Sequence, residues 1–252
     1  MSRYIIDVPR LHVAGPIAAG REIALDRQQG NYLLNVLRLG AGASILIFNG
    51  RDGEWLADIR LPSRKTAALS PREMTRAQTA ASDLRFLFAP LKHARLDYMV
   101  QKAVEMGVSR LMPVLTRRTQ VARLNLERMQ ANAVEAAEQC GILSLPEIAE
   151  PAPLERLLAQ WPADVRLIFC DEDEAVADPV KAIRAAGLSK DAPLAVLIGP
   201  EGGFDEGERR AIKALPQALP ISLGPRILRA DTAAVAALAV VQAAVGDWRG
   251  EV

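Results

Sequence analysis

The chain has 252 residues, half of them hydrophobic and 24% charged, which is typical of a globular protein with one large domain or two ordinary ones. No apolar leader marks the amino terminus, and the weakly polar run 232–246 is too short to cross a bilayer, so we expect a soluble, cytoplasmic protein. Two histidines and two widely separated cysteines argue against a histidine-rich metal site and a disulfide framework, and no metal is expected.

The net charge of +1 conceals a strong asymmetry along the chain. Residues 1–128 contain 20 lysines and arginines against 11 acidic residues, whereas residues 129–252 contain 11 against 19. A basic front half of this kind indicates a polyanionic partner such as RNA. Arginine, which predominates there, binds phosphates at two points and stacks on bases. The alternative is a chance distribution of solvated surface charge.

Residues 1–72 have the pattern of a small, mostly β module. Strands are predicted at 3–8 and 23–26, and a hairpin at 43–61 whose turn contains Gly50 and Gly53, both suited to positive φ. Between them, residues 26–40 have the apolar spacing of a short helix that ends at Gly40. The polar segment 73–83 lacks strand character and is predicted to be a linker.

A second module begins with the apolar segment 84–91, which predicts a buried strand. Residues 94–106 follow with helical apolar spacing, Gly107 ends that helix, and residues 110–115 form the next strand. Lys102 and Glu105 are spaced to form a weak surface pair on this helix.

Later in the chain, residues 165–170 predict a strand that leads into an acidic run. Ligands of open α/β sheets gather beyond the carboxyl ends of strands, so residues 170–172 are expected either to border a ligand or to form a solvated loop. The final helix, 232–245, is apolar nearly all round, which indicates burial in the core or against a partner subunit.

Two strand–loop–helix units lie back to back between Pro193 and Val245. The first loop, GPEGGFDEGE (199–208), contains a predicted capping box, and the second, GPRILRAD (224–231), ends at an acid predicted to cap the last helix. Glycine after a strand lets backbone N–H groups face a ligand, so both loops can converge on one small molecule. Neither contains G-x-G-x-x-G or a P-loop, which argues against a dinucleotide enzyme. Ordinary strand-to-helix turns are the alternative.

The segments LIGPEGGFDEGE and LGPRILRADTA resemble the signature loops of SPOUT-class RNA methyltransferases. Together with QKAVEMGV and PVLTRR, they are most similar to the RsmE family, which methylates N3 of a uridine in small-subunit (16S) ribosomal RNA. The resemblance implies an α/β fold, with a SPOUT-type trefoil knot at 84–252 that binds S-adenosylmethionine. It also implies a smaller PUA-like β-barrel at 1–72 that binds RNA, and a homodimer.

The resemblance and the chemistry of the reaction assign roles to individual residues. Arg226 would stabilise the anion that develops when uracil N3 loses its proton, and Glu201 would hold the cofactor or the target base. The expected cofactor-binding residues are Leu197, Ile198, Gly199, Pro200, Glu201, Gly202, Gly203, Leu223, Gly224, Ile227, Leu228 and Ala230. The expected RNA-binding residues are Arg3, Arg10, Arg38, Arg95, Lys102 and Arg118.

Four positions depart from the usual RsmE pattern. Tyr32 stands where the family usually has histidine, and Ile142 stands where it has arginine, which removes one cationic contact. Ala230 and Asp231 replace a threonine and a glutamate in the second loop. Two other functions stay open from the sequence: methylation at a different RNA position, and a non-catalytic RNA-binding factor for ribosome assembly.

Overall fold

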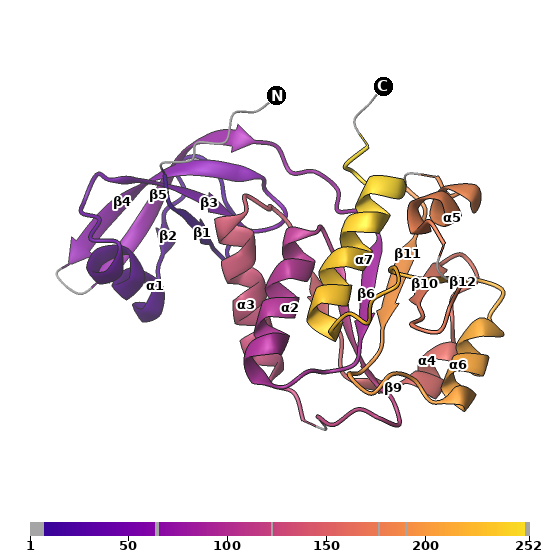
Figure 1. Cartoon of the computed structure of the whole chain (residues 1–252). Coiled ribbons are helices and arrows are strands. Elements are labelled where there is room, and N and C mark those ends of the chain that lie inside the picture. The colour runs from indigo at the N-terminus through magenta and orange to yellow at the C-terminus, as the bar shows by residue number, and fades with distance from the viewer. Residues whose placement is uncertain (1–7, 64–65, 122, 176, 190, 250–252) are drawn as a thin grey trace. The chain divides into compact units, whose positions relative to one another are not determined.

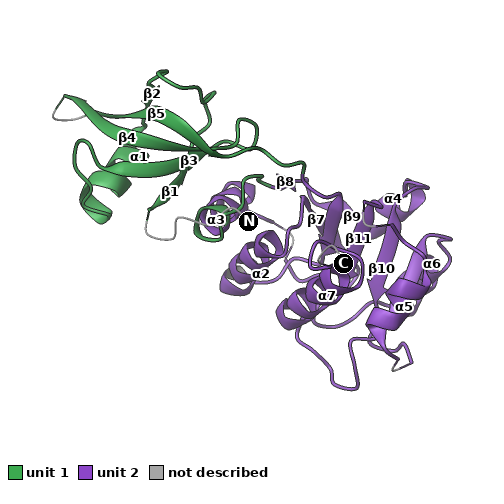
Figure 2. Cartoon of the chain, turned by 90° about the horizontal axis from the view of Figure 1, so that it is seen from above, with its two compact units in different colours: residues 1–80, 137–145 green, residues 81–136, 146–252 purple. Residues whose placement is uncertain are grey.

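The computed structural model describes residues 8–63, 66–121, 123–175, 177–189 and 191–249. The chain divides into two compact units (Figure 2). The N-terminal unit comprises residues 1–80 and 137–145, and the C-terminal unit comprises residues 81–136 and 146–252. The middle of the chain therefore returns a short segment, 137–145, to the N-terminal unit.

The N-terminal unit is built on a five-stranded sheet with the order β1-β3-β4-β5-β2. Its strands are β1 (Arg10–His12), β2 (Ile23–Ala24), β3 (Ser44–Phe48), β4 (Glu54–Ser63) and β5 (Thr66–Arg76). The predicted hairpin is confirmed as β3–β4, and Gly50 and Gly53 take φ values of 79° and 78° in its turn. Alternate apolar side chains of β3 and β4, including Ile45, Ile47 and Ile59, are fully buried in the core of this unit.

Two predictions for this unit need correction, and a third concerns residues that the structure does not describe. The predicted helix begins as α1 (Arg27–Asn31) and continues as the π-helical turn η1 (Tyr32–Val36), but it stops before Gly40 because Arg38 takes a left-handed φ of 55°. Strand β5 continues to Arg76, so residues 73–76 pair with β4 and are not linker. The predicted strand 3–8 falls, apart from Val8, outside the described residues.

A buried carboxylate ties the segment 137–145 to the sheet. Glu54 is held by Arg76 (2.6 Å) and Arg10 (2.9 Å), and Arg10 also donates to main-chain carbonyls of Glu138 and Ile142. Burial alone would raise the pKa of Glu54, but hydrogen bonds from Arg76, Thr75 and Arg10 outweigh it and lower the pKa. The Arg10 side chain is only 9% exposed, which argues against the predicted contact with RNA.

The C-terminal unit has a parallel sheet with the order β12-β10-β11-β6-β7-β8, and β9 also pairs with β7. Its strands are β6 (Leu84–Phe88), β7 (Arg110–Leu115), β8 (Glu147–Ile148), β9 (Ala152–Pro153), β10 (Arg166–Cys170), β11 (Leu194–Ile198) and β12 (Ala218–Ile221). From β6 the chain first adds strands on one side and later returns to build the other. The order therefore reverses between β6 and β11, which is the kind of position where open α/β sheets bind ligands.

Six helices of the described chain accompany this sheet: α2 (His93–Glu105), α3 (Leu126–Gln139), α4 (Leu154–Ala159), α5 (Pro179–Ala185), α6 (Glu206–Lys213) and α7 (Ala230–Ala244). Helix α7 packs against α2 and α5, whereas α4 packs against α6 (Figure 1). The segment 84–91, predicted to be a buried strand, forms β6 only over residues 84–88, and the helix ended by Gly107 and the strand 110–115 are confirmed.

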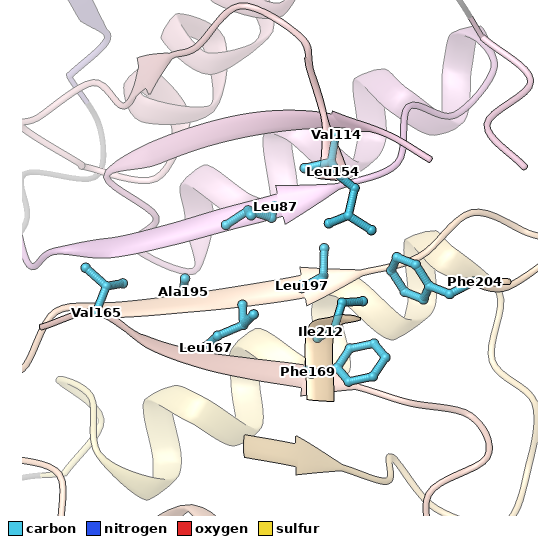
Figure 3. Close-up of a cluster of buried hydrophobic side chains, with 10 residues drawn as sticks. All are labelled: Leu87, Val114, Leu154, Val165, Leu167, Phe169, Ala195, Leu197, Phe204 and Ile212. Carbon is cyan, nitrogen blue, oxygen red and sulfur yellow. The ribbon is translucent and has the colours of Figure 1, made fainter. Parts of the chain in front are cut away.

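Apolar side chains of the central strands meet those of α6 in a buried cluster (Figure 3). Leu87, Leu167 and Leu197 come from three neighbouring strands, and Ile212 comes from α6. Phe204, which lies in the first glycine loop, joins the same cluster with its ring edge-on to Phe169 at 5.4 Å. The core of the unit thus extends into the loop that follows β11.

Candidate active site

A pocket of about 300 Å³ opens where strands β10, β11 and β12 end. Both glycine-rich loops line it, as the sequence predicted. The predicted site residues in its wall are Ile198, Gly199, Pro200, Glu201, Gly203, Leu223, Gly224, Arg226, Ile227, Leu228 and Ala230. Residues 170–172 also line the pocket, so the acidic run after β10 borders the site.

Two predicted residues lie elsewhere, and several wall residues were not predicted. Leu197 is fully buried in the hydrophobic cluster rather than in the pocket, because successive residues of β11 face opposite sides of the sheet. Gly202 packs beside the Arg118 side chain. The additional wall residues are Phe204, Arg209, Ser222, Pro225, Arg229 and Ala233. Arg209 and Ala233 lie in the first turns of α6 and α7, just after the loops. The sequence patterns that predict strands and loops do not mark such positions.

The first loop is held tightly from within the unit. A Cβ placed on Gly199 would lie 2.6 Å from the Phe204 ring, so only glycine fits between strand β11 and that ring. The predicted capping box is confirmed: Asp205 accepts from the Glu208 N–H (2.7 Å), and Glu208 accepts from the Asp205 N–H (3.1 Å). The hydrogen bond from the Glu208 N–H is the main cause of a lowered pKa for Asp205.

Arginines from two other segments contact the first loop on its exposed side. Arg95 of α2 lies 3.3 Å from the Glu201 carboxylate, and Arg118, after β7, donates to the Gly202 carbonyl at 2.6 Å. Arg117 pairs with Asp205 at 3.1 Å. Two residues predicted to bind RNA, Arg95 and Arg118, are therefore engaged with the first glycine loop.

The remaining predicted RNA-binding residues have varied surroundings. Lys102 pairs with Glu105 at 2.7 Å, as the spacing indicated, and its Nζ lies 5.5 Å from the Tyr98 ring. Arg38 is exposed at the end of the short helix. Arg3 lies outside the described residues.

Ion pairs connect the end of β10, beside the pocket, to α6. The Asp171 side chain is fully buried and pairs with Lys213 (2.8 Å) and Arg209 (3.3 Å), both on α6. Hydrogen bonds to Asp171 and then to Glu174 raise the pKa of Lys213. Burial raises the pKa of the Cys170 thiol to about 12, so this thiol remains protonated at neutral pH and does not act as a nucleophile.

The second loop is far less constrained. Gly224 takes a φ of 105° with open space around its Cα, and its N–H donates to Ser222 Oγ at 3.3 Å. Within the described chain Arg226 makes no hydrogen bond or ion pair, and the Ile227 side chain is 90% exposed. The prediction that Asp231 caps the last helix is wrong: α7 begins at Ala230 with Arg229 as N-cap, so Asp231 lies in its first turn.

Comparison with known proteins identifies the family. The model of an RNA methyltransferase domain matches residues 78–242, and that of an RNA methyltransferase PUA domain matches residues 25–71. The chain belongs to this RNA methyltransferase family. Its α/β fold with an N-terminal PUA-like domain is thereby confirmed, whereas the trefoil knot stays a prediction.

Individual relatives agree over nearly the whole length of the chain. A ribosomal RNA small subunit methyltransferase E from Rickettsia conorii is 28% identical and covers 92% of this chain and 94% of its own. Among solved structures, a methyltransferase from Legionella pneumophila in complex with S-adenosylmethionine (SAM) has a TM-score of 0.81 at 29% identity, covering 96% of this chain and 99% of its own. A ribosomal RNA small subunit methyltransferase E from Neisseria gonorrhoeae, also bound to SAM, has a TM-score of 0.79 at 26% identity, covering 94% and 97%. The resemblance to the RsmE family is thus confirmed.

The described residues contain no group of three or more histidines, cysteines or acids arranged to hold a metal. In the same part of the chain, every helix is too short or too polar to traverse a membrane.

Proposed function

We propose that this protein transfers a methyl group from SAM to N3 of a uridine in small-subunit (16S) ribosomal RNA. The observation that carries the proposal is that both signature loops line the same pocket, at the carboxyl ends of β10, β11 and β12. The names of the relatives from Rickettsia conorii and Neisseria gonorrhoeae support a small-subunit RNA substrate. A substrate of this kind places the reaction in the cytoplasm.

The residues present suit SAM. The pocket volume lies within the range of small-molecule sites, and its wall includes apolar side chains such as Ile198, Leu223 and Leu228, which fit an adenine ring. Main-chain groups at Gly224 are open to polar atoms of the ligand, because no Cβ shields them and no other atom lies near the Cβ position. The wall also contains the exposed carboxylates of Glu172 and Glu201, each close to an arginine, and these carboxylates suit polar and cationic groups of the cofactor.

When bound, SAM supplies a methyl group on a sulfonium sulfur, which is activated for displacement. The chain holds the two reactants in line and stabilises charge. Arg226 lines the pocket with an unpaired guanidinium, so it is available to stabilise the anion of a deprotonated uracil. A guanidinium offers no lone pair to accept a proton, so the N3 proton leaves to solvent water. Glu201, also in the wall, orients the base or the cofactor.

We assign RNA binding to the PUA-like domain together with Arg38, Arg95, Lys102 and Arg118, with Arg3 as a further contact. We also propose a homodimer formed through α7. One side of this helix is buried in the unit, whereas Val235, Ala236, Ala239 and Val240 remain partly exposed and apolar. Light scattering on the eluted protein checks the dimer: a mass of one chain at micromolar concentration would exclude it.

The test is methylation with purified protein. Small subunits and free rRNA are incubated with SAM, and the RNA is digested and mapped by mass spectrometry. The proposal requires a 3-methyluridine. Methylation of another atom would indicate a different RNA methyltransferase, and failure to bind SAM in calorimetry would indicate a non-catalytic RNA-binding factor.

A substitution at Arg226 tests whether its positive charge stabilises the uracil anion. Arg226→Ala should reduce kcat by about 10²–10³, as for loss of one donor to a developing anion. Arg210→Ala, which removes an exposed arginine of α6 outside the pocket wall, is the matched control and should retain full activity.

A further inference from the structure

The first glycine loop is connected to the exposed surface of the C-terminal unit through arginines. Arg95, Arg117 and Arg118 reach it from α2 and from the turn after β7, and each contacts a different part of the segment 201–205. The Arg117 N–H also donates to Glu208 Oε1 at 2.8 Å, which fixes the turn 117–118 to the start of α6. The turn and the loop therefore form one connected patch.

Among these contacts, that of Arg118 differs in kind. Arg95 and Glu201 form an exposed ion pair, which contributes little because both side chains are solvated. Arg117 acts at the helix start rather than on the loop. Arg118 donates to the main-chain carbonyl of Gly202, in the middle of the loop, and its aliphatic stem packs on the same residue, with Cδ 3.5 Å from the position of a Cβ. It thus restrains the loop backbone itself.

Arg118 also keeps donors free. The residue is exposed, and within the described chain its guanidinium makes a single hydrogen bond, to Gly202. A guanidinium carries several N–H groups in a planar fork, and phosphate oxygens are well suited to bind those that remain. The geometry therefore allows one side chain to hold the cofactor loop and an RNA phosphate simultaneously.

We infer that Arg118 is a positioning residue that couples RNA binding to cofactor binding: an RNA phosphate fixes its guanidinium, which in turn fixes the loop through the Gly202 carbonyl. This inference rests on the proposed function, since it requires both ligands. Each ligand then increases the affinity for the other by the same factor, because the coupling of two binding equilibria is reciprocal. Part of the gain is the entropy of the loop, which the second ligand no longer has to order.

The experiment is calorimetry with S-adenosylhomocysteine, the demethylated product form of the cofactor, in the absence and presence of a small-subunit rRNA fragment. For the wild type, the RNA fragment should increase the affinity for this probe. Arg118→Ala should weaken binding of the probe about tenfold without RNA, as for loss of a hydrogen bond from a charged donor, and should abolish the increase with RNA. The salt dependence of RNA binding should also decrease by roughly one phosphate.

Two further variants make the outcome specific. Arg123→Ala removes an exposed arginine of the same segment that makes no hydrogen bond or ion pair in the described chain, and it should bind the probe as the wild type does. Arg118→Lys keeps the charge without the fork and should lose most of the coupling.

The inference is overturned if Arg118→Ala binds the probe as tightly as the wild type. It is also overturned if Arg123→Ala abolishes the coupling, or if Arg118→Lys retains it in full. If the wild type itself does not bind the probe, the proposed function fails first. Because Arg118 is exposed and its variants lose only one hydrogen bond, their melting temperature should fall by no more than about 2–4 °C, which a thermal scan verifies.

Discussion

The two loops of the pocket both begin with Gly-Pro after a strand, but the protein supports them to very different degrees. The first is held by the Phe204 ring in the core, by the capping box of Asp205 and by the Arg118 contact to Gly202. The second has two long hydrogen bonds between Ser222 and Gly224, at 3.3 and 3.5 Å, and its Ile227 side chain projects into solvent. One wall of the pocket is thus preformed, whereas the other has groups available for a ligand to order.

Because of this difference, substitutions in the two loops should differ in their effects on protein stability and on cofactor binding. A change in the first loop disturbs contacts that already exist in the free protein, so it should lower the free energy of unfolding. A change in the second loop removes contacts that form only with a ligand, so it should mainly lower affinity. Four substitutions test the distinction, in order of decreasing effect on stability.

The largest effect is expected for Gly199→Ala. The added methyl would lie 2.6 Å from the Phe204 ring and force it out of the core, which should cost about 1–3 kcal/mol of unfolding free energy and most of the cofactor affinity. Gly202→Ala is the control in the same loop, because its methyl meets Arg118 only at ordinary contact distance. Urea unfolding and calorimetry measure both quantities. Equal stability of the two variants would show that the first loop is not packed as described.

Gly224→Ala tests the second loop. Its φ of 105° strains any side chain, at a cost of about 1–2 kcal/mol, but no neighbouring atom is close enough to clash. Gly187→Ala shares the positive φ and the open surroundings and lies outside the pocket, so it should be destabilised similarly while retaining affinity. Of the two variants, only Gly224→Ala should bind S-adenosylhomocysteine more weakly than the wild type. If both variants bound it as tightly as the wild type, the conformation of Gly224 would not matter for binding.

A smaller effect is expected for Asp205→Ala, which removes the cap of α6. The melting temperature should fall by about 2–4 °C, as for loss of one N-cap side chain in a domain of this size. Asp178→Ala removes the equivalent cap of α5, where Asp178 accepts from the Lys181 N–H, and should produce a similar fall. Only Asp205→Ala should also weaken cofactor binding, since its cap adjoins the pocket loop.

The sequence predicted the parts of the molecule that depend on local chemistry. The hairpin turn at Gly50 and Gly53, the strand 110–115 and the capping box at Asp205 each follow from the residue types at a few neighbouring positions, and all are confirmed. The two loops were recognised through their resemblance to the SPOUT signature loops, because glycine spacing alone also fits ordinary strand-to-helix turns.

What the sequence did not reveal depends on partners far away in the chain. Arg10 was assigned to RNA as a basic residue of a basic half, but it is buried against Glu54, which lies 44 residues away. Its neutralising partner cannot be identified from local charge counts. The helix end at Arg38 was missed because the left-handed residue is not a glycine. Arg209 was missed because its role arises only when α6 packs beside β10.

The smallest effect on stability is expected for Ile227→Ala. The side chain is 90% exposed, so its loss should change the unfolding free energy of the free protein by no more than about 0.5 kcal/mol. Because Ile227 also lines the pocket, a ligand that covers it would bury apolar surface, and affinity for S-adenosylhomocysteine should fall about fivefold. Val36→Ala, an exposed aliphatic residue of the N-terminal unit, is the control and should change neither quantity. If Ile227→Ala lowered the melting temperature but left the affinity for S-adenosylhomocysteine unchanged, the contacts of Ile227 would form in the free protein and not in the complex. The proposed difference between the two loops would then be wrong.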